Sequence, residues 1–487
     1  MNRYYIDLFG CVKNQVDAEN MMAVLNSAGW ESAADAESSD LIIVNSCGFI
    51  ESAKQESINA VLRWRKLYPD KKILLAGCLA QRYAKELPEI LTEADGFFGV
   101  NNLDSIAEKS SEILSGDLTP GNISQGRINS ARKTPLNEPR LIRHSAGRGS
   151  AGERPLLSLP GSVYVKISEG CDNRCSYCAI PLIRGVLVSR EIPDIVDECR
   201  ILLTRGVKEL CIIGQDIGAF GADRQKNKIK DAAGNERYSQ LPELLKAISI
   251  LDGHFWVRLL YIHPDHFPLK ILDLIEKDKR FLPYFDIPFQ HASAKILNAM
   301  NRRGTADQYL DLLKTIRARL PDAVIRSTFL LGFPGETEED FAALLDFQDK
   351  ARLDWLGCFT YSREEGTKSF SMKGRVPAKT AVTRKNIIEE RQIPITEKNM
   401  ERFSGSDIEV LLEEKFNENS AGSVESGEIF WLGRTYFQAP DIDGSTVIVQ
   451  QKSMANNKEE MNQQAGTFLK CRIIARRGFD LEAQIIR

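Results

Sequence analysis

The sequence predicts an α/β fold in three parts: an N-terminal parallel α/β domain, a central partial β/α barrel of the TIM type and a small all-β barrel at the C-terminus. Short apolar runs alternate with helix-period segments up to about residue 100. The same alternation continues through six further runs between residues 162 and 361, and β-like runs with Gly and Asp turns follow residue 400. A length of 487 residues also fits about three domains.

The first domain is predicted over residues 1–115 and contains four short apolar runs. We expect strands at Tyr4–Phe9, Leu41–Val44, Ile73–Ala76 and Phe97–Val100. Apolar residues at i, i+3, i+4 and i+7 indicate helices at Ala18, Met21, Met22, Leu25 and at Ala80, Tyr83, Ala84, Leu87. These helices should cover a parallel sheet.

The second domain is predicted over residues 161–400, after a linker at 116–160 that is rich in Gly, Ser, Pro and Arg. Six strands separated by helical segments suggest an open or partial β/α barrel, with its chemistry at the carboxyl ends of the strands. They are expected at Val163–Ile167, Glu209–Ile213, Trp256–Leu260, Tyr284–Ile287, Val324–Leu331 and Trp355–Tyr361. The polar segment 222–239 interrupts this pattern and is expected to be a surface insertion.

The third domain is predicted over residues 401–487. Its short β-like runs indicate a small barrel. They are Ile408–Leu412, Val447–Gln450, Phe468–Ala475 and Leu481–Ile486.

Composition limits the class of protein. Hydrophobic residues make up 43% and charged residues 27%, no apolar run approaches the ~18 residues of a membrane span, and no signal peptide is evident. We therefore expect a cytoplasmic protein without a membrane partner. A net charge of −3 gives no whole-chain basic excess for nucleic acid, and ten cysteines without a secretion signal favour metal or cluster ligation over disulfides.

Three thiols, Cys171, Cys175 and Cys178, form a C-x3-C-x2-C loop just after the first barrel strand. Three thiolates on a four-iron cluster leave one iron without a protein ligand, whereas electron-transfer clusters commonly use four. The open iron can bind a substrate or cofactor. The alternatives are a zinc knuckle or unrelated core cysteines, but C-x3-C is unusual for zinc and no fourth Cys or His lies nearby in the sequence.

The loop 171–178, with Ala179-Ile180-Pro181-Leu182-Ile183-Arg184-Gly185 after it, resembles the radical S-adenosylmethionine (SAM) superfamily. This resemblance implies a 4Fe-4S cluster whose open iron chelates SAM. It also implies that an electron from the cluster cleaves SAM to a radical that abstracts hydrogen from an unactivated C–H bond.

A second set of thiols, Cys11, Cys47 and Cys78, follows the first three predicted strands, each beside a glycine. In open α/β sheets ligands collect at the carboxyl edge, and glycine lets a bulky group approach the backbone. These thiols could therefore hold a second cluster with one open iron. The alternative is that they are ordinary buried hydrophobes, and their shared structural position argues against it.

Two cysteine triads and this three-part organisation resemble the methylthiotransferase family over nearly the full chain. Asn45–Ile50 and Ala76–Cys78 look like its N-terminal ligand motifs, and Leu432–Thr435 and Ala439–Gly444 look like its TRAM domain. The resemblance implies two 4Fe-4S clusters, of which the second supplies or carries sulfur. It also implies that one SAM generates the radical and another provides the methyl group.

The substrate of this family is an aspartate of ribosomal protein uS12 or an adenosine in tRNA. Segments at Leu260–Pro264, Asp286–His291 and Arg326–Glu336 look like the uS12-modifying branch. Residues 401–487 carry ten basic and fourteen acidic side chains, so this domain suits a basic ribosomal protein better than RNA. We predict methylthiolation at the β-carbon of a uS12 aspartate, recognised through the TRAM domain. A tRNA enzyme and a non-catalytic iron-sulfur electron carrier are the alternatives.

For five other side chains, a role at the site has a structural alternative. Tyr177, Gln215 and Arg326 look like SAM contacts, with ordinary packing as the alternative. His263 and His291 could orient substrate or be structural histidines. A reducing partner such as flavodoxin is implied, and four further cysteines are interpreted as packing residues: Cys199, Cys211, Cys358 and Cys471.

Overall fold

The structure is a computed structural model that describes residues 1–116, 154–224, 229–230, 236–237, 239–416, 428–451 and 464–486. The chain divides into two compact units, neither of which is a single stretch of sequence. Unit 1 is Met1–Leu157, Ser168–Glu198 and Ser362–Ser371, and unit 2 is Ser158–Ile167, Cys199–Tyr361 and Met372–Arg487. The linker predicted at 116–160 and the insertion predicted at 222–239 lie largely outside the described residues.

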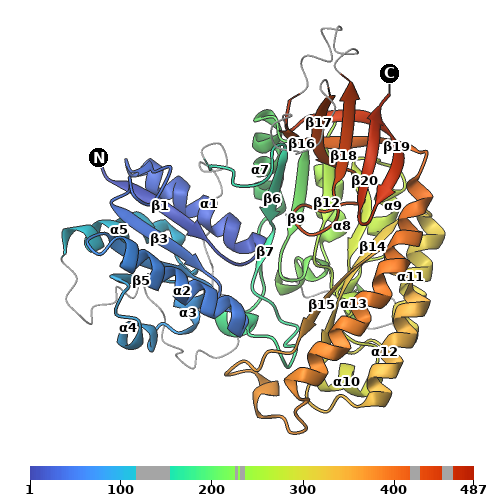
Figure 1. Cartoon of the computed structure of the whole chain (residues 1–487), viewed down its shortest axis with the longest axis horizontal. Coiled ribbons are helices and arrows are strands. Elements are labelled where there is room, and N and C mark those ends of the chain that lie inside the picture. Colours follow the sequence, from blue (N-terminus) through green and yellow to red (C-terminus); the bar gives the residue numbers. More distant parts are fainter. Residues whose placement is uncertain are drawn as a thin grey trace. The chain divides into compact units, whose positions relative to one another are not determined.

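Unit 1 contains a five-stranded parallel sheet in the order β2-β1-β3-β4-β5 (Figure 1). The four predicted strands are confirmed with small shifts at their ends. The short edge strand β2 was not predicted, because two residues carry no periodic signal. The bounds are β1 Arg3–Leu8, β2 Glu31–Ser32, β3 Leu41–Ser46, β4 Lys72–Gly77 and β5 Gly96–Phe98.

Helices cover both faces of this sheet because successive strand side chains point to opposite sides. Leu41 and Ile43 pack with α1 (Val12–Ser27) and α5 (Ile106–Ser115), the latter preceded by the short η1 (Leu103–Ser105). Ile42 and Val44 pack on the other face with α2 (Glu51–Leu67), α3 (Cys78–Arg82) and α4 (Leu87–Ile90).

The prediction of one helix through Ala80–Leu87 is wrong. The structure has two short helices there, α3 and α4, and Tyr83 ends the first with a non-helical backbone. Pro88 lies in the first turn of α4, where proline's fixed φ and missing N–H cost nothing.

The remaining elements of unit 1 frame the loop that carries Cys171, Cys175 and Cys178. Strands β7 (Ser168–Glu169) and β8 (Val188–Ser189) pair antiparallel on either side of it, and α6 (Ile180–Ile183) lies within it. The start of α7 (Ile192–Thr204) and the short η6 (Lys368–Ser371) also belong to this unit.

Unit 2 contains a six-stranded parallel sheet in the order β15-β14-β13-β12-β9-β6. The strands of this sheet follow one another in space in the same order as in the sequence. Among the described strands, the two edge strands β6 and β15 pair on one side only. The partial β/α barrel is therefore confirmed. Its strands are β6 Ser162–Lys166, β9 Glu209–Ile213, β12 Trp256–Leu259, β13 Phe281–Asp286, β14 Val324–Leu331 and β15 Trp355–Thr360.

Helices connect and cover these strands. Capping boxes at Thr305 and Thr337 start α11 and α12, where each threonine satisfies a backbone N–H of the first turn. The main helices are α8 Leu241–Ile248, α9 Ile271–Ile275, α10 Ala294–Ala299, α11 Ala306–Arg319, α12 Glu338–Ala351 and α13 Ala378–Met400. Short elements are η3 Ile217–Ala219, η4 Ala222–Arg224, η5 Pro264–His266, η7 Glu401–Phe403 and the strand pair β10 Ile229–Lys230 and β11 Glu236–Arg237.

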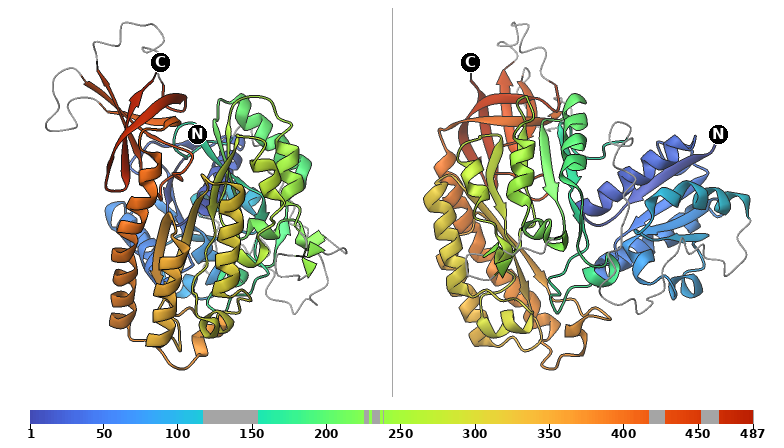
Figure 2. Two further views of the ribbon diagram at one scale, coloured as in Figure 1. Left: turned by 90° about the vertical axis from the view of Figure 1, so that its right-hand side faces the viewer. Right: turned by 180° about the vertical axis from the view of Figure 1, so that it is seen from behind.

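The C-terminal part of unit 2 is a closed barrel in the order β16-β17-β18-β20-β19. Its strands are red in Figure 2. The predicted small barrel is confirmed, although its second strand was not among the predicted ones. The strands are β16 Asp407–Phe416, β17 Glu428–Arg434, β18 Thr446–Gln451, β19 Phe468–Arg477 and β20 Asp480–Ile485. Within the described ranges, no helix combines the length and the apolar character needed to cross a membrane.

Candidate functional site: two cysteine triads in one compact unit

The first three cysteines lie in loops at the carboxyl edge of the unit 1 sheet. Cys11 is the N-cap of α1, Cys47 directly follows β3, and Cys78 is the first residue of α3 after β4. These loops pack closely, because a β-carbon at Gly10 would lie 2.9 Å from Cys47 Cβ and 3.3 Å from its Sγ. The structure thus brings together three thiols that the sequence spreads over 68 residues.

Glycines make this approach possible. A β-carbon at Gly48 would lie 2.7 Å from the carbonyl oxygen of Cys78, and Gly77 has a positive φ of 95°. Both positions exclude larger side chains, the first by contact and the second by backbone strain as well. Glycine beside each thiol therefore keeps the three loops close to one another.

Burial sets the electrostatics of two of these thiols. Cys47 and Cys78 are buried, whereas Cys11 is exposed. Burial raises the pKa of Cys78 to about 12, against an opposing effect of Arg184, and it also raises the pKa of Cys47. A thiol in such surroundings stays protonated unless a metal displaces its proton, so bare Cys78 is a poor nucleophile but remains available as a ligand.

A polar cluster surrounds Cys78. Its thiol donates to Asn14 Oδ1 at 3.1 Å, and Arg184 Nη2 donates to Cys78 Sγ at 3.1 Å, to Asn14 Oδ1 at 2.8 Å and to Asp17 Oδ2 at 2.9 Å. Arg184 Nη1 also donates to Glu169 Oε1 at 2.8 Å. The arginine is 3% exposed, so its charge is balanced by two carboxylates inside the protein.

Asn14 joins the first two loops of the triad. Its Nδ2 donates to the carbonyl oxygens of Phe9 at 3.1 Å and Ser46 at 2.9 Å, and Asn45 Nδ2 donates back to the carbonyl of Asn14 at 2.7 Å. Sequence reasoning missed Asn14, Asp17 and Arg184 as site residues. Cys11, Asn14 and Asp17 form a C-x2-N-x2-D pattern that places them on one side of α1. This spacing could have drawn attention to Asn14 and Asp17.

The other triad lies in a tight loop between β7 and β8. Gly170 has a φ of 71°, and a β-carbon there would collide with Val186 O at 2.0 Å. The N–H of Cys171 donates to Gly185 O at 3.2 Å, and that of Cys178 donates to Cys175 O at 3.1 Å. Cys171, Cys175 and Cys178 are each partly exposed, as ligands of a cluster that must meet a cofactor should be.

The two triads belong to the same compact unit. Helix α6 begins two residues after Cys178, and its Ile183, with Ala179, packs against Cys78. Phe49 and Val100 border this cluster. The segment 168–198, predicted as part of the central barrel, therefore packs with the N-terminal sheet in unit 1.

The donor set fits two clusters of the three-thiol type. All six candidate ligands are cysteines, and glycines leave room beside them. No three Cys, His, Asp or Glu side chains in the described part of the chain converge tightly enough for one metal ion. Cysteine thiolates are the usual ligands of four-iron clusters, so the residue types present suit two of them.

Iron content tests both triads. After anaerobic reconstitution we expect about eight irons per chain, falling to about four when Cys171, Cys175 and Cys178 are replaced by alanine. The matching variant at Cys11, Cys47 and Cys78 should also retain about four. Iron and sulfide analysis checks this, and about four irons in the unchanged chain would contradict it.

The three predicted SAM contacts belong to different elements of the fold. Tyr177 precedes Cys178 in the unit 1 loop, and Gln215 follows the carboxyl end of β9 in unit 2. Arg326 is the third residue of β14, near its amino end, and pairs at 3.4 Å with Asp286 and with Asp443. A contact of Arg326 with SAM stays a prediction.

The remaining predicted positions have local partners. His291 is fully buried, and its Nδ1 accepts from the N–H groups of Ala292 and Ser293 at 3.0 Å. Burial lowers the pKa of His291 to about 4, so its imidazole is neutral near pH 7. His263 Nδ1 accepts from Asp265 N at 3.2 Å. The four cysteines interpreted as packing residues are all buried: Cys199, Cys211, Cys358 and Cys471.

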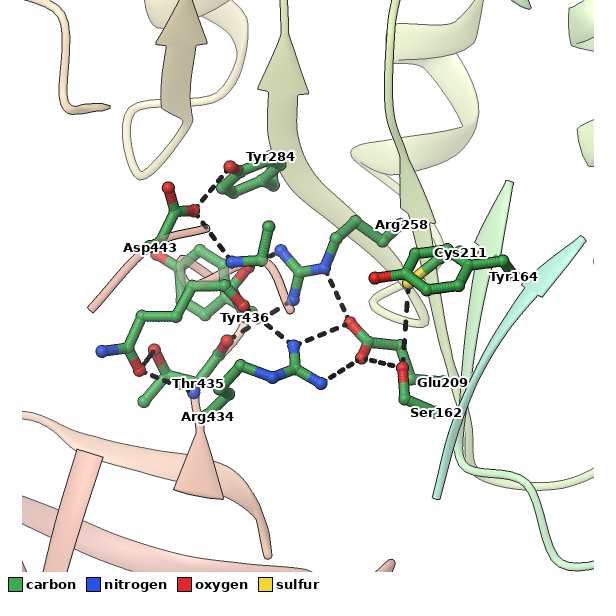
Figure 3. A network of polar contacts seen from close by, with 12 residues as sticks. Ser162, Tyr164, Glu209, Cys211, Arg258, Tyr284, Arg434, Thr435, Tyr436 and Asp443 are labelled. Carbon is green, nitrogen blue, oxygen red and sulfur yellow. Dashed lines mark hydrogen bonds and ion pairs between the residues drawn. The ribbon is translucent and has the colours of Figure 1, made fainter. Parts of the chain in front are cut away.

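Unit 2 also contains a buried ionic cluster that joins the small barrel to the parallel sheet (Figure 3). Glu209 on β9 accepts from Arg258 on β12 at 2.6 Å and from Arg434 on β17 at 2.6 Å. Ser162 Oγ also donates to Glu209 at 2.8 Å. This cluster, and not a ligand, accounts for these buried charges.

Comparison with known proteins agrees with this architecture. Three family models match: an uncharacterized protein family, UPF0004, at residues 3–99, the radical SAM superfamily at 165–347 and the TRAM domain at 405–486. The radical SAM superfamily implies a 4Fe-4S cluster and SAM as cofactors.

Curated relatives match over nearly the whole chain. The ribosomal protein uS12 methylthiotransferase RimO of Treponema denticola is 47% identical, covering 98% of this chain and 99% of its own. The proteins of the same name from Syntrophomonas wolfei and Bdellovibrio bacteriovorus are 38% and 37% identical, each covering 99% of this chain and 99% and 97% of their own.

Among solved structures, the radical SAM methyltransferase TsrM from Kitasatospora setae superposes with a TM-score of 0.52. The match covers 76% of this chain and 74% of that one at 16% identity. At this identity the likeness concerns the fold alone.

Proposed function

Because the chain belongs to the RimO family of radical SAM methylthiotransferases, we propose that it transfers a methylthio group to ribosomal protein uS12. The proposed position is the β-carbon of an aspartate side chain. One SAM would provide the radical that removes hydrogen from this carbon, and another would provide the methyl group. A ribosomal substrate would place the reaction in the cytoplasm.

The observation that carries this proposal is the presence of two cysteine triads in one compact unit. A radical enzyme needs one cluster site, at Cys171, Cys175 and Cys178. The other triad, at the carboxyl edge of the unit 1 sheet, has no role in radical generation and is suited to hold sulfur for transfer. When bound, the clusters supply the electron that cleaves SAM and an iron that carries the sulfur.

The surrounding residues of unit 1 would prepare these sites. Asn14 fixes the loops of Cys11 and Cys47 through its bonds to Phe9 and Ser46. Gly48 lets the loop of Cys47 reach the backbone at Cys78. Tyr177 is proposed to orient SAM from the loop of Cys178. A contact of SAM with Gln215, after β9, is a separate proposal.

The TRAM barrel is the proposed contact for uS12. Residues 401–487 carry four more acidic than basic side chains, which suits a basic ribosomal protein and is a poor surface for RNA phosphates. We expect no stable nucleic-acid partner. A low-potential donor such as flavodoxin would supply electrons. Membership of an enzyme family argues against the alternative of a non-catalytic electron carrier.

Mass spectrometry of uS12 from a deletion strain tests the substrate. We expect the methylthio group to disappear from uS12 and to return when the unchanged chain is expressed again. Nucleoside analysis of tRNA from the same strain serves as the control and should show no change. A uS12 that keeps its methylthio group, together with a loss of methylthioadenosine from tRNA, would assign the enzyme to tRNA.

A further inference from the structure

The buried Arg184 contacts Cys78 of the N-terminal triad, and the residue after it contacts the backbone of the other triad. The side chain of Arg184 donates to Cys78 Sγ at 3.1 Å, while its neighbour Gly185 accepts the N–H of Cys171 at 3.2 Å. Arg184 ends α6, which follows the last thiol of the radical triad. Arg184 thus contacts a thiol of one triad, and the adjacent Gly185 holds the backbone of the loop that carries the other.

The arginine is charged, although it is almost fully buried. Burial alone would lower its pKa, but Glu169 and Asp17 keep that pKa above its usual value. Their carboxylates lie 2.8 Å and 2.9 Å from its guanidinium nitrogens. The two ion pairs position the guanidinium so that Nη2 also reaches the sulfur of Cys78.

We propose that Arg184 is a positioning residue that raises the reduction potential of a cluster bound at Cys11, Cys47 and Cys78. This inference rests on the proposed function, which places a cluster there. A reduced cluster carries one more negative charge on its iron and sulfur atoms than an oxidised one. A cation that donates a hydrogen bond to a ligand sulfur therefore stabilises the reduced state more.

The low polarity of the surroundings strengthens this effect. Cys78 is 6% exposed and Arg184 is 3% exposed, and Ala179 and Ile183 pack against the same thiol. Little water screens a charge in such a place. The effect on the reduction potential depends on the balance between the positive charge of Arg184 and the negative charges of its carboxylates. Removing the positive charge should lower the reduction potential, and removing one negative charge should raise it.

The test uses the full chain with Cys171, Cys175 and Cys178 replaced by alanine, which leaves one cluster site, after anaerobic reconstitution. EPR-monitored redox titration gives the potential of that cluster. We expect Arg184→Gln to lower the ratio of reduced to oxidised cluster at least tenfold at a fixed applied potential. This corresponds to a fall of the cluster's reduction potential by about 59 mV for a one-electron couple. Asp17→Asn keeps the arginine and removes one opposing charge, so it should raise the ratio. Arg184→Lys should restore part of the loss.

Arg154→Gln is the matched control. Arg154 is also a buried arginine of unit 1, 3% exposed, and its ion-pair partners are Glu19 and Glu198. Replacing it removes a buried charge of the same kind without removing a contact to a ligand sulfur. The ratio of reduced to oxidised cluster in this variant should equal that of the parent chain.

The outcomes separate the inference from the proposed function. A parent chain that binds no iron overturns the N-terminal cluster itself. If all variants bind as much iron as the parent chain and keep its reduction potential, the role of Arg184 is overturned, while the N-terminal cluster stands. If Arg184→Gln fails to fold or to hold iron, Asp17→Asn decides, and a potential that does not rise overturns the proposal.

Discussion

Replacing Cys11, Cys47 and Cys78 together by alanine is expected to abolish methylthiolation of uS12 while reductive cleavage of SAM continues. The three thiols lie at one edge of the unit 1 sheet, separate in sequence from the loop of Cys171, Cys175 and Cys178. Loss of the N-terminal site removes the place for transferable sulfur but leaves the radical-generating site. We expect methylthiolation to fall by at least about 100-fold, the upper range for perturbing a metal site without removing its ligands.

Two assays on one reaction mixture check this result. Mass spectrometry measures methylthiolated uS12, and chromatography measures 5'-deoxyadenosine. The variant at Cys171, Cys175 and Cys178 should lose both signals, and the packing variant Cys358→Ala should keep both. Methylthiolated uS12 formed at the normal rate by the Cys11, Cys47 and Cys78 variant would show that the N-terminal thiols do not take part in sulfur transfer.

The substitution Arg434→Met is expected to lower the free energy of unfolding of unit 2 by about 3–5 kcal/mol, the usual cost of leaving a buried charge without its partner. Arg434 pairs with Glu209 at 2.6 Å and with Glu413, and both carboxylates are buried. Without the arginine, Glu209 retains Arg258, whereas Glu413 loses its ion-pair partner. Urea unfolding followed by tryptophan fluorescence measures the change, because Trp256, Trp355 and Trp431 lie in this unit.

An exposed pair on the same barrel provides the control. Arg472 bonds Asp407 at 2.6 Å, but both side chains are about half exposed, so Arg472→Met should cost less than about 1 kcal/mol. Equal costs for the two substitutions would mean that the buried cluster contributes no more than a surface pair.

The same cluster predicts a pH dependence. Burial would raise the pKa of Glu209, but Arg434 and Arg258 overcome burial and lower the pKa from 4.5 to about 2. A lowered carboxyl pKa contributes stability that is fully present above pH 4.5 and is lost as the pH falls towards 2. The stability difference between the unchanged chain and Glu209→Gln should therefore shrink over this range in acid unfolding experiments.

Much of the fold follows from apolar runs in the sequence. The strand at Glu209–Ile213 has the predicted bounds, because a buried parallel strand reads as a nearly continuous run of apolar residues. The strand at Val324–Leu331 also has the predicted bounds, although Arg326, Ser327 and Thr328 interrupt its apolar run. The helix break at Tyr83 did not follow, since the periodicity of Ala80 to Leu87 continues through it. There the local geometry of Pro88 overrides the pattern.

In the candidate site, the thiols were singled out from the sequence, whereas the side chains around them were not. Cysteine spacing and the neighbouring glycines marked all six thiols as candidate ligands, and their role as ligands stays a prediction. Arg184 lies 106 residues from Cys78, and no periodic signal connects them. Such a contact depends on how α6 packs against α3, which the sequence does not reveal. For Arg326, the pattern could not foresee that Asp443 of the small barrel would pair with it.

Unit 1 is assembled from three separate stretches of sequence, and this has a practical consequence for engineering. An exchange of parts between relatives at the sequence boundaries near residues 116 and 160 would separate Arg184 from Asn14 and Asp17, since Ser168–Glu198 packs with the N-terminal sheet. The smallest exchangeable module is therefore discontinuous. A chimaera that keeps both cysteine triads intact must take residues 1–157, 168–198 and 362–371 from the same parent.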